Sequence, residues 1–293
     1  MAPVGLGRDE RGAVYVEFLL AFLPIFLMFL AICQVAFLVA GRIVVNHAAL
    51  AGARSAIVVL EDDPRYYADA ERGWVSDKPR AQAGGGPLSS LADLLSGPTG
   101  TPTAASPSPA SKGSRQQGLR MQAIRRAVSQ PLTAIAPTAA TLLGAGSASL
   151  RASLDRDEKA ARAFSNVYVA AAAAVSVHDG EGREELAAEP IGPNAPVTVR
   201  VTFVQLCGVP AVRGLICRPL SSLLDAPARK NDGKPEPQAT LRERLALSGM
   251  PGWLETAASA GARFVVFEAQ VTLPNQGAAY DRAEKSDDQA ASL

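Results

Sequence analysis

The chain has 293 residues, and its 29 Lys and Arg against 28 Asp and Glu leave a formal net charge of +1 at pH 7. No basic patch is interleaved with aromatic residues, so the sequence gives no indication of a nucleic-acid partner. Aromatic residues make up only 5% of the chain beside 25 glycines and 21 prolines, a composition typical of a loop-rich protein rather than a dense enzyme core. The length allows a membrane helix with one modest domain, or one domain with long insertions.

A long apolar run follows a short polar segment at the N-terminus. It extends from Phe18 to Gly41 without a charged side chain, and about 24 residues at about 1.5 Å each give about 36 Å of helix, enough to cross a bilayer core with some tilt. Pro24 is tolerated in a membrane helix and is expected to kink or loosen it. We predict one helix over residues 14–60, ended by Asp62-Asp63-Pro64. Its second half carries a stripe of small apolar residues, which comprises Val45, Ala49, Gly52, Ala53 and Ala56.

A single carboxylate, Glu17, stands at the head of the apolar run. An ionisable side chain in a membrane segment is costly, by about 3 kcal/mol on insertion scales, and is therefore a functional hypothesis by default. The plain alternative is that Glu17 lies among the lipid headgroups. A cleaved signal peptide is a competing interpretation of the whole run, but the run is longer than a typical signal core and no good cleavage site follows it before Arg42.

The residues around Glu17 resemble a known processing site. Gly12, followed by Ala13-Val-Tyr-Val-Glu17-Phe18, is similar to the site at which a membrane peptidase cuts type IV prepilins after the glycine, so that the carboxylate becomes the fifth residue of the mature chain. With the apolar helix and the segment Asn46–Arg54 beyond it, residues 10–60 resemble the TadE-like minor pseudopilins of tight-adherence (Flp) pili.

This resemblance implies a structural function. Cleavage would fall between Gly12 and Ala13, Glu17 together with Phe18 would act in assembly, and the chain would help to build a pilus or a related secretion apparatus. The expected location is the inner membrane, crossed once, with a cytoplasmic N-terminus and a periplasmic C-terminal domain. The expected partners are the prepilin peptidase, other pseudopilins and pilus-assembly proteins, with no nucleic acid and no small-molecule substrate.

The chain after the helix divides into three parts. Residues 61–118 are expected to be an irregular linker, in which the glycine-rich stretch Ala83–Pro87 lacks the Gly-Lys-Ser/Thr ending of a phosphate-binding loop. Residues 119–277 are expected to form the exported domain, and residues 278–293 a flexible tail. These parts follow a leader over residues 1–12 and the helical segment over residues 13–60.

The exported domain is predicted to be α+β. One helix is expected from Leu119 to Gln130, stopped by Pro131, and a second from Arg156 to about Val177, with Asp155 able to cap its start. The second carries an apolar face that includes Ala161, Phe164, Tyr168, Ala171 and Val175.

Two later segments alternate apolar and polar side chains. Val197–Phe203 and Phe264–Leu273 both show the period of two that indicates a half-buried strand. We predict that they pair antiparallel in a small sheet laid against the long helix.

The three cysteines have different settings. Cys33 lies within the apolar run and is expected to be an inert apolar residue. Cys207 and Cys217 flank a short segment, and they are a disulfide candidate if that segment lies outside the cytoplasm. Two free thiols or a metal site are the alternatives, but the sequence has no C-x-x-C and only two histidines, which disfavours the metal.

No arrangement typical of catalysis is found. The histidines are His47 and His178, and His178 beside Asp179 is expected to be a solvated helix cap; no Gly-x-Ser-x-Gly motif is present. A cluster of glutamates at positions 184, 185 and 189 is expected to be solvated. We therefore predict no catalytic residue, cofactor or metal. The alternative function is a single-pass, membrane-anchored periplasmic protein with an uncleaved anchor that binds a ligand or partner.

Overall fold

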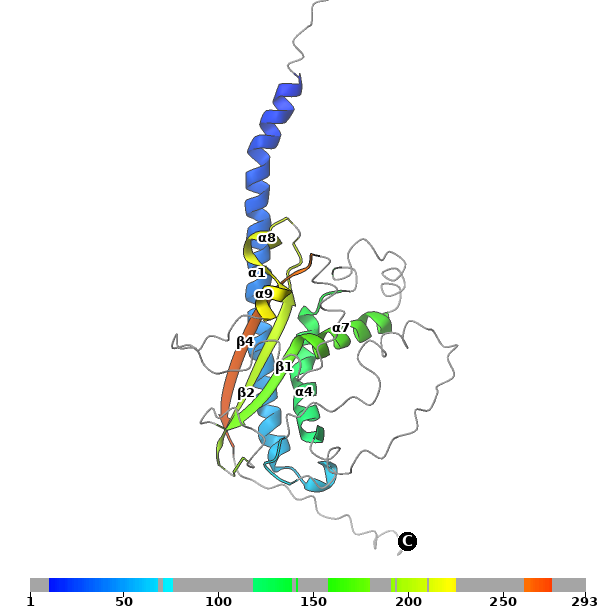
Figure 1. Cartoon of the computed structure of the whole chain (residues 1–293), viewed down its shortest axis with the longest axis vertical. Helices are drawn as coiled ribbons and strands as arrows, with labels where there is room; N and C mark the ends of the chain where they lie inside the picture. Colours follow the sequence, from blue (N-terminus) through cyan, green and yellow to red (C-terminus); the bar gives the residue numbers. More distant parts are fainter. Residues whose placement is uncertain are drawn as a thin grey trace, which may run out of the picture.

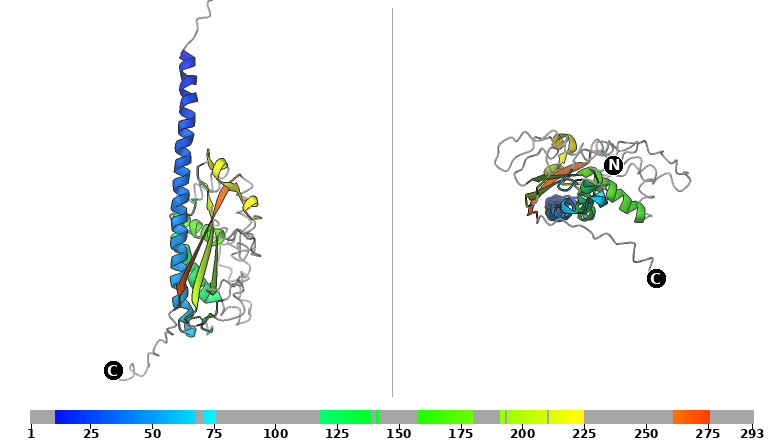
Figure 2. Two further views of the ribbon diagram at one scale, coloured as in Figure 1. Left: turned by 90° about the vertical axis from the view of Figure 1, so that its left-hand side faces the viewer. Right: turned by 90° about the horizontal axis from the view of Figure 1, so that it is seen from below.

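The computed structural model describes residues 11–67, 71–75, 118–138, 141, 158–179, 191–192, 194–209, 211–224 and 261–275. Within these ranges the fold is α+β, as the sequence predicts. A four-stranded antiparallel sheet in the order β1-β2-β4-β3 lies against the second half of a very long helix, α1, whose first half projects beyond the domain (Figures 1 and 2).

Helix α1 (Arg11–Glu61) is continuous over 51 residues and runs through Pro24 without interruption. It ends directly before Asp62-Asp63-Pro64, as predicted, and a 3-10 turn, η1 (Pro64–Tyr67), follows. The predicted stripe of small residues is buried against the domain, whereas polar side chains on the other faces are exposed. The exposed polar residues of this half include Arg42, Asn46 and Arg54.

The two predicted strands form the centre of the sheet. Strand β2 (Pro196–Leu206) pairs antiparallel with β4 (Arg263–Pro274), which confirms the predicted pairing. In this register Val201 lies opposite Ala269 and Phe203 lies opposite Phe267, so the apolar positions of both strands share the face that packs on α1. The short strand β3 (Arg218–Pro219) pairs with the start of β4.

Helix α4 (Gly118–Leu132) packs beside α1 and buries the predicted apolar face, Met121, Ile124 and Val128. The expectation that Pro131 stops this helix is wrong, because α4 includes Pro131 and continues into a 3-10 turn, η2 (Thr133–Ile135). A proline so near the C-terminus disrupts little of the helix, and the fully buried Leu132 holds this last turn in the core.

The predicted helix from Arg156 to Val177 is correct only in its first part. Helix α7 (Glu158–Ala172) ends early, and residues Ala173–Asp179 form strand β1, which pairs along β2. The alternation of Val175 and Val177 suits a strand, and pairing with β2 outweighs the helix propensity of the preceding alanines. As predicted, Phe164, Tyr168 and Ala171 are buried, but Ala161 is exposed.

Several predictions concern residues outside the described ranges. These residues are 1–10 of the leader, most of the 61–118 linker including Ala83–Pro87, Asp155 and Arg156, the glutamates at positions 184, 185 and 189, and the tail over residues 278–293.

Candidate functional site

The first half of α1 presents its apolar side chains outward. Every described side chain from Tyr15 to Phe29 is exposed. Within the described part of the chain, α1 is the one helix that is long and apolar enough to cross a membrane. We call residues 15–33 the projecting segment of α1 (Figure 2). So large an apolar surface on one element marks a site that contacts lipid or another protein.

An aromatic ridge runs along one face of the projecting segment. Phe18, Phe22 and Phe26 follow at intervals of four residues, and successive rings stack with centroids 5.5 Å and 5.6 Å apart. Residues at this spacing are neighbours on a helix surface. The ridge is therefore a continuous row of stacked rings that begins next to Glu17.

Glu17 and Phe18 are both exposed on the first turns of the projecting segment. Within the described part of the chain Glu17 has no ion-pair partner. Gly12 and Ala13 lie in the first turn of α1. Ala13 precedes Glu17 by four residues, about 6 Å along the axis and on the same side of the helix.

The second half of α1, residues 34–61, is the packed segment. Its buried face consists of small side chains such as Ala49, Ala53 and Ala56, which allow α4 and the sheet to approach closely. Gly52 shows how close this approach is, because a Cβ atom there would lie 2.5 Å from Val128 Cγ2 and 3.2 Å from Val199 Cγ1. A side chain at this position would therefore separate α1 from its neighbours.

A buried arginine holds the C-terminal end of α1. Arg120 of α4 is 0% exposed, and its guanidinium donates hydrogen bonds to the carbonyl oxygens of Val59, Leu60 (3.2 Å) and Asp62 (3.2 Å). The last carbonyls of a helix have no partner within the helix and carry its partial negative charge. Arg120 donates hydrogen bonds to these carbonyl oxygens and places a positive charge beside them. It thereby links the end of α1 to α4.

The groups around Arg120 have shifted pKa values. Burial lowers the pKa of the Arg120 guanidinium below its ordinary value, although the nearby Tyr67 and Asp62 oppose the shift. The guanidinium carbon lies 4.4 Å from the centre of the Tyr67 ring, a cation–π distance. Burial, together with the hydrogen bond that the Tyr67 hydroxyl donates to Asp62 (3.1 Å), raises the pKa of Tyr67.

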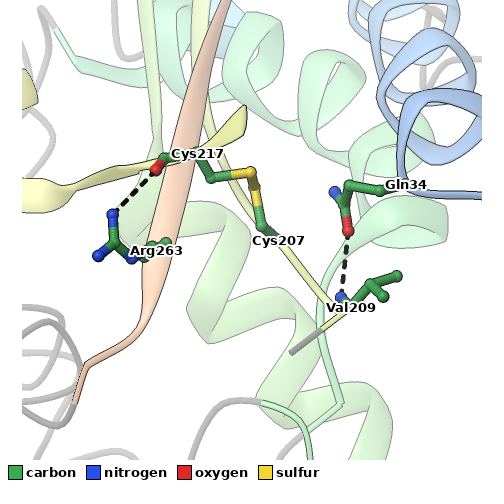
Figure 3. Close-up of a disulfide and its surroundings, with 5 residues drawn as sticks. All are labelled: Gln34, Cys207, Val209, Cys217 and Arg263. Carbon is green, nitrogen blue, oxygen red and sulfur yellow. Dashed lines mark hydrogen bonds between the residues drawn. A yellow bond between two sulfur atoms is a disulfide. The ribbon is translucent and has the colours of Figure 1, made fainter. Parts of the chain in front are cut away.

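The predicted disulfide between Cys207 and Cys217 is present, with Cα atoms 6.6 Å apart. It closes the segment from Cys207 to Cys217, which we call the disulfide loop. The Val209 N–H of this loop donates a hydrogen bond of 3.1 Å to Gln34 Oε1 on α1, as Figure 3 shows. The loop therefore meets α1 where the projecting segment ends. Cys33 is free and partly buried.

The expectation that His178 caps a helix is wrong. His178 lies in strand β1, is largely buried, and its Nε2 lies 2.8 Å from Ser176 Oγ. It belongs to a polar face of the sheet on which Arg200 pairs with Glu268 across β2 and β4. The Arg200–Glu268 pair bridges neighbouring strands and stabilises the sheet. His47 is exposed on α1.

The predictions from the sequence did not include Gln34 or Arg120, although the sequence contains a feature that could have identified each of them. Gln34 is the one amide side chain within the apolar run from Phe18 to Gly41, and Arg120 adjoins the apolar face of a predicted helix. A polar side chain in an apolar surface has to find a buried partner. Within the described ranges no group of three or more His, Cys, Asp or Glu side chains could hold a metal ion.

Residues 12–54 match the model of a family described as TadE-like protein. The N-terminal segment is TadE-like. The match begins at Gly12 and covers the whole projecting segment and most of the packed segment, so the TadE-like segment includes Glu17, the aromatic ridge and the stripe of small residues. No curated protein and no solved structure matches the chain. The match indicates a component associated with a Tad pilus.

Proposed function

We propose that this protein is a minor pseudopilin-like structural component of a tight-adherence (Flp) pilus or a related secretion apparatus, without catalytic activity of its own. The proposal rests on one combination of features. The TadE-like match begins at Gly12, and the helix that follows exposes a membrane-length apolar surface with a carboxylate at its head. A prepilin peptidase would cut between Gly12 and Ala13.

The chemistry of Glu17 follows from this cut. Cleavage creates an ammonium at Ala13, which can pair with the Glu17 carboxylate of the same chain or of a neighbouring subunit. A lone carboxylate in a low-dielectric environment is expensive, whereas a paired one is tolerated. The pair would favour one register between adjacent helices, and the aromatic ridge that starts at Phe18 supplies the apolar contact beside it.

The proposed topology places the short N-terminus in the cytoplasm and the domain in the periplasm. The projecting segment would cross the inner membrane once. The disulfide between Cys207 and Cys217 supports a periplasmic domain, because disulfides persist in oxidising compartments and are rare in the cytosol.

The deciding experiment is to determine the mature N-terminus of the membrane-extracted protein, in cells with and without the prepilin peptidase, by intact-mass or N-terminal peptide analysis. We expect a peptidase-dependent start at Ala13. A start at Met1 or Ala2 in both strains would contradict processing and favour an anchored binding protein. A start after residue 40 would mean a cleaved signal peptide and would contradict the pilus assignment.

The role of Glu17 is tested separately. Glu17→Ala and the size-matched Glu17→Gln are expected to leave membrane insertion intact but to abolish most incorporation into the apparatus, because neither can pair with an ammonium. Glu17→Asp should retain part of it. Arg42→Gln, which removes an exposed charge from the same helix, is the control and should incorporate normally. Normal pilus assembly with Glu17→Ala would overturn the proposed role.

A further inference from the structure

Exposed large apolar side chains are rare outside α1. Within the described ranges there are three, Tyr66 (53% exposed), Leu215 (82%) and Ile216 (37%). Leu215 and Ile216 are adjacent and lie on helix α8 (Arg213–Ile216) of the disulfide loop. Arg213 precedes them and the exposed Arg218 follows Cys217. Two protruding apolar side chains flanked by arginines are typical of a segment that enters a membrane interface.

Hydrogen bonds connect both ends of the disulfide loop to Arg263, the first residue of β4. The Cys207 N–H donates a hydrogen bond to the Arg263 carbonyl oxygen (2.9 Å), and the Arg263 guanidinium donates one to the Cys217 carbonyl oxygen (3.3 Å). Within the loop, the Arg213 N–H bonds to the Val209 carbonyl oxygen and the Cys217 N–H to the Arg213 carbonyl oxygen, both at 3.0 Å. These hydrogen bonds hold the backbone that carries Leu215 and Ile216 in place relative to strand β4.

Contacts with α1 also fix the position of the disulfide loop along the axis of this helix. The Val209 N–H bonds to Gln34, whose side chain is 1% exposed, and Gly41 lies directly against the Gln205 side chain. In Figure 1, α8 lies at the end of the domain that faces the projecting segment. Figure 3 shows Val209 reaching Gln34 from the disulfide loop.

The length of free helix brings this end of the domain to a bilayer. From Phe18 to Cys33, α1 offers about 24 Å of helix at about 1.5 Å per residue, whereas the hydrocarbon core of a bilayer is about 30 Å thick. With Glu17 at one boundary of the hydrocarbon core, Gln34 lies at the opposite boundary of that core or just inside it. The other faces of α1 at this level remain apolar and exposed, as Val35, Phe37 and Val39 show. That surface suits lipid and not water.

We propose that the disulfide loop docks on the phospholipid surface of the leaflet that faces the domain. Leu215 and Ile216 insert at the boundary between headgroups and acyl chains, and Arg213 and Arg218 contact lipid phosphates. The loop is a second membrane contact beside α1 and fixes the orientation of the domain relative to the bilayer. A lipid surface is favoured over a protein partner because the loop continues the surface of the spanning helix at the same height. This inference rests on α1 crossing a bilayer, but not on cleavage after Gly12 or on the role of Glu17.

The test uses the full chain in vesicles of phosphatidylethanolamine and phosphatidylglycerol. The protein-to-lipid ratio is kept so low that most vesicles that contain protein contain a single chain. Leu215→Trp is compared with Tyr66→Trp, a matched exposed site in turn η1 at the opposite end of α1. The native tryptophans contribute equally to both. Vesicles whose acyl chains are brominated near the headgroup should quench most of the emission added at position 215 and leave the emission added at position 66 almost unchanged.

Two further arms complete the test. Ile216→Trp should be quenched like Leu215→Trp, which covers the case in which one variant fails to fold. Arg213→Gln combined with Arg218→Gln should lower the quenching at position 215 in phosphatidylglycerol-containing vesicles to its value in phosphatidylcholine vesicles. Equal quenching at positions 215 and 66 would overturn the proposal and leave a protein partner as the occupant of the loop. Because no peptidase or pilus protein is present, this outcome is independent of the proposed function.

Discussion

The two halves of α1 are equally helical, but they have opposite environments. The projecting segment carries Phe, Leu and Ile side chains that are exposed, whereas the packed segment buries Ala, Gly and Val against α4 and the sheet (Figure 2). The projecting segment has no charged side chain beyond Glu17, whereas the packed segment carries Arg42, Arg54 and Glu61. The apolar side chains differ in size as well, because those on the buried face of the packed segment are mostly small and those on the projecting segment are mostly large.

Side-chain size decides the environment through packing distance. Small residues let backbones approach closely, so that many weak dispersion contacts form between elements. At Gly52 the approach leaves no space for even one additional carbon. Large flexible side chains on the projecting segment instead provide apolar surface in all directions, which suits a lipid environment. The comparison predicts that the packed segment is sensitive to substitutions that the projecting segment tolerates.

The largest effect is expected at the end of the packed segment. Arg120→Met should destabilise the domain by about 3 kcal/mol, because it leaves buried carbonyl oxygens of α1 without a donor. Urea unfolding of the detergent-solubilised full chain, followed by tryptophan fluorescence, measures this loss. Arg126→Met, at an exposed position on the same helix, should cost less than about 0.5 kcal/mol. Equal stability of the two variants would show that Arg120 does not support the end of α1.

A matched pair of substitutions tests the comparison directly. Ala49→Leu adds volume to a fully buried site of the packed segment and should cost about 2 kcal/mol through overpacking. Ala21→Leu makes the same change at an exposed site of the projecting segment and should leave the unfolding midpoint of the domain unchanged. Similar destabilisation by both would contradict the distinction between the lipid-facing and the packed surface of α1.

The smallest effect is expected at alkaline pH. Tyr168 is fully buried, its hydroxyl donates a hydrogen bond of 2.7 Å to the Val204 carbonyl oxygen, and burial raises its pKa well above 10.0. The unfolded chain loses this proton first, so the stability that Tyr168 contributes is complete below pH 10 and falls above it, by up to about 1.4 kcal/mol per pH unit.

Tyr168→Phe isolates this contribution. The variant should lose about 1 kcal/mol at neutral pH with the hydrogen bond, and its stability should fall less steeply than that of the unsubstituted protein above pH 10. Urea unfolding at several pH values measures both, while circular dichroism should show that the projecting segment stays helical in micelles. Parallel pH profiles of the two proteins would contradict a raised pKa for Tyr168.

Much of the fold could be predicted because its signals are local. The apolar run and Asp62-Asp63-Pro64 determine where α1 lies and where it ends, and alternation within Val197–Phe203 and Phe264–Leu273 identifies the two central strands and their inner faces. The TadE-like resemblance likewise depends on one continuous segment, from the residues around Glu17 through the apolar run to Asn46–Arg54. Local backbone preference and side-chain period are properties of short segments, so the sequence alone determined them.

The remaining features depend on which distant segments meet. Residues Ala173–Asp179 become strand β1 because β2 offers a partner, against the helix propensity of the alanines that precede them. Arg120 caps the C-terminal end of α1 because α4 lies beside that end. Gln34 marks the start of the packed segment because the disulfide loop bonds to it. Burial and hydrogen-bond partners are properties of the assembled chain, so only the tertiary structure decided how much of the apolar run is left for the membrane.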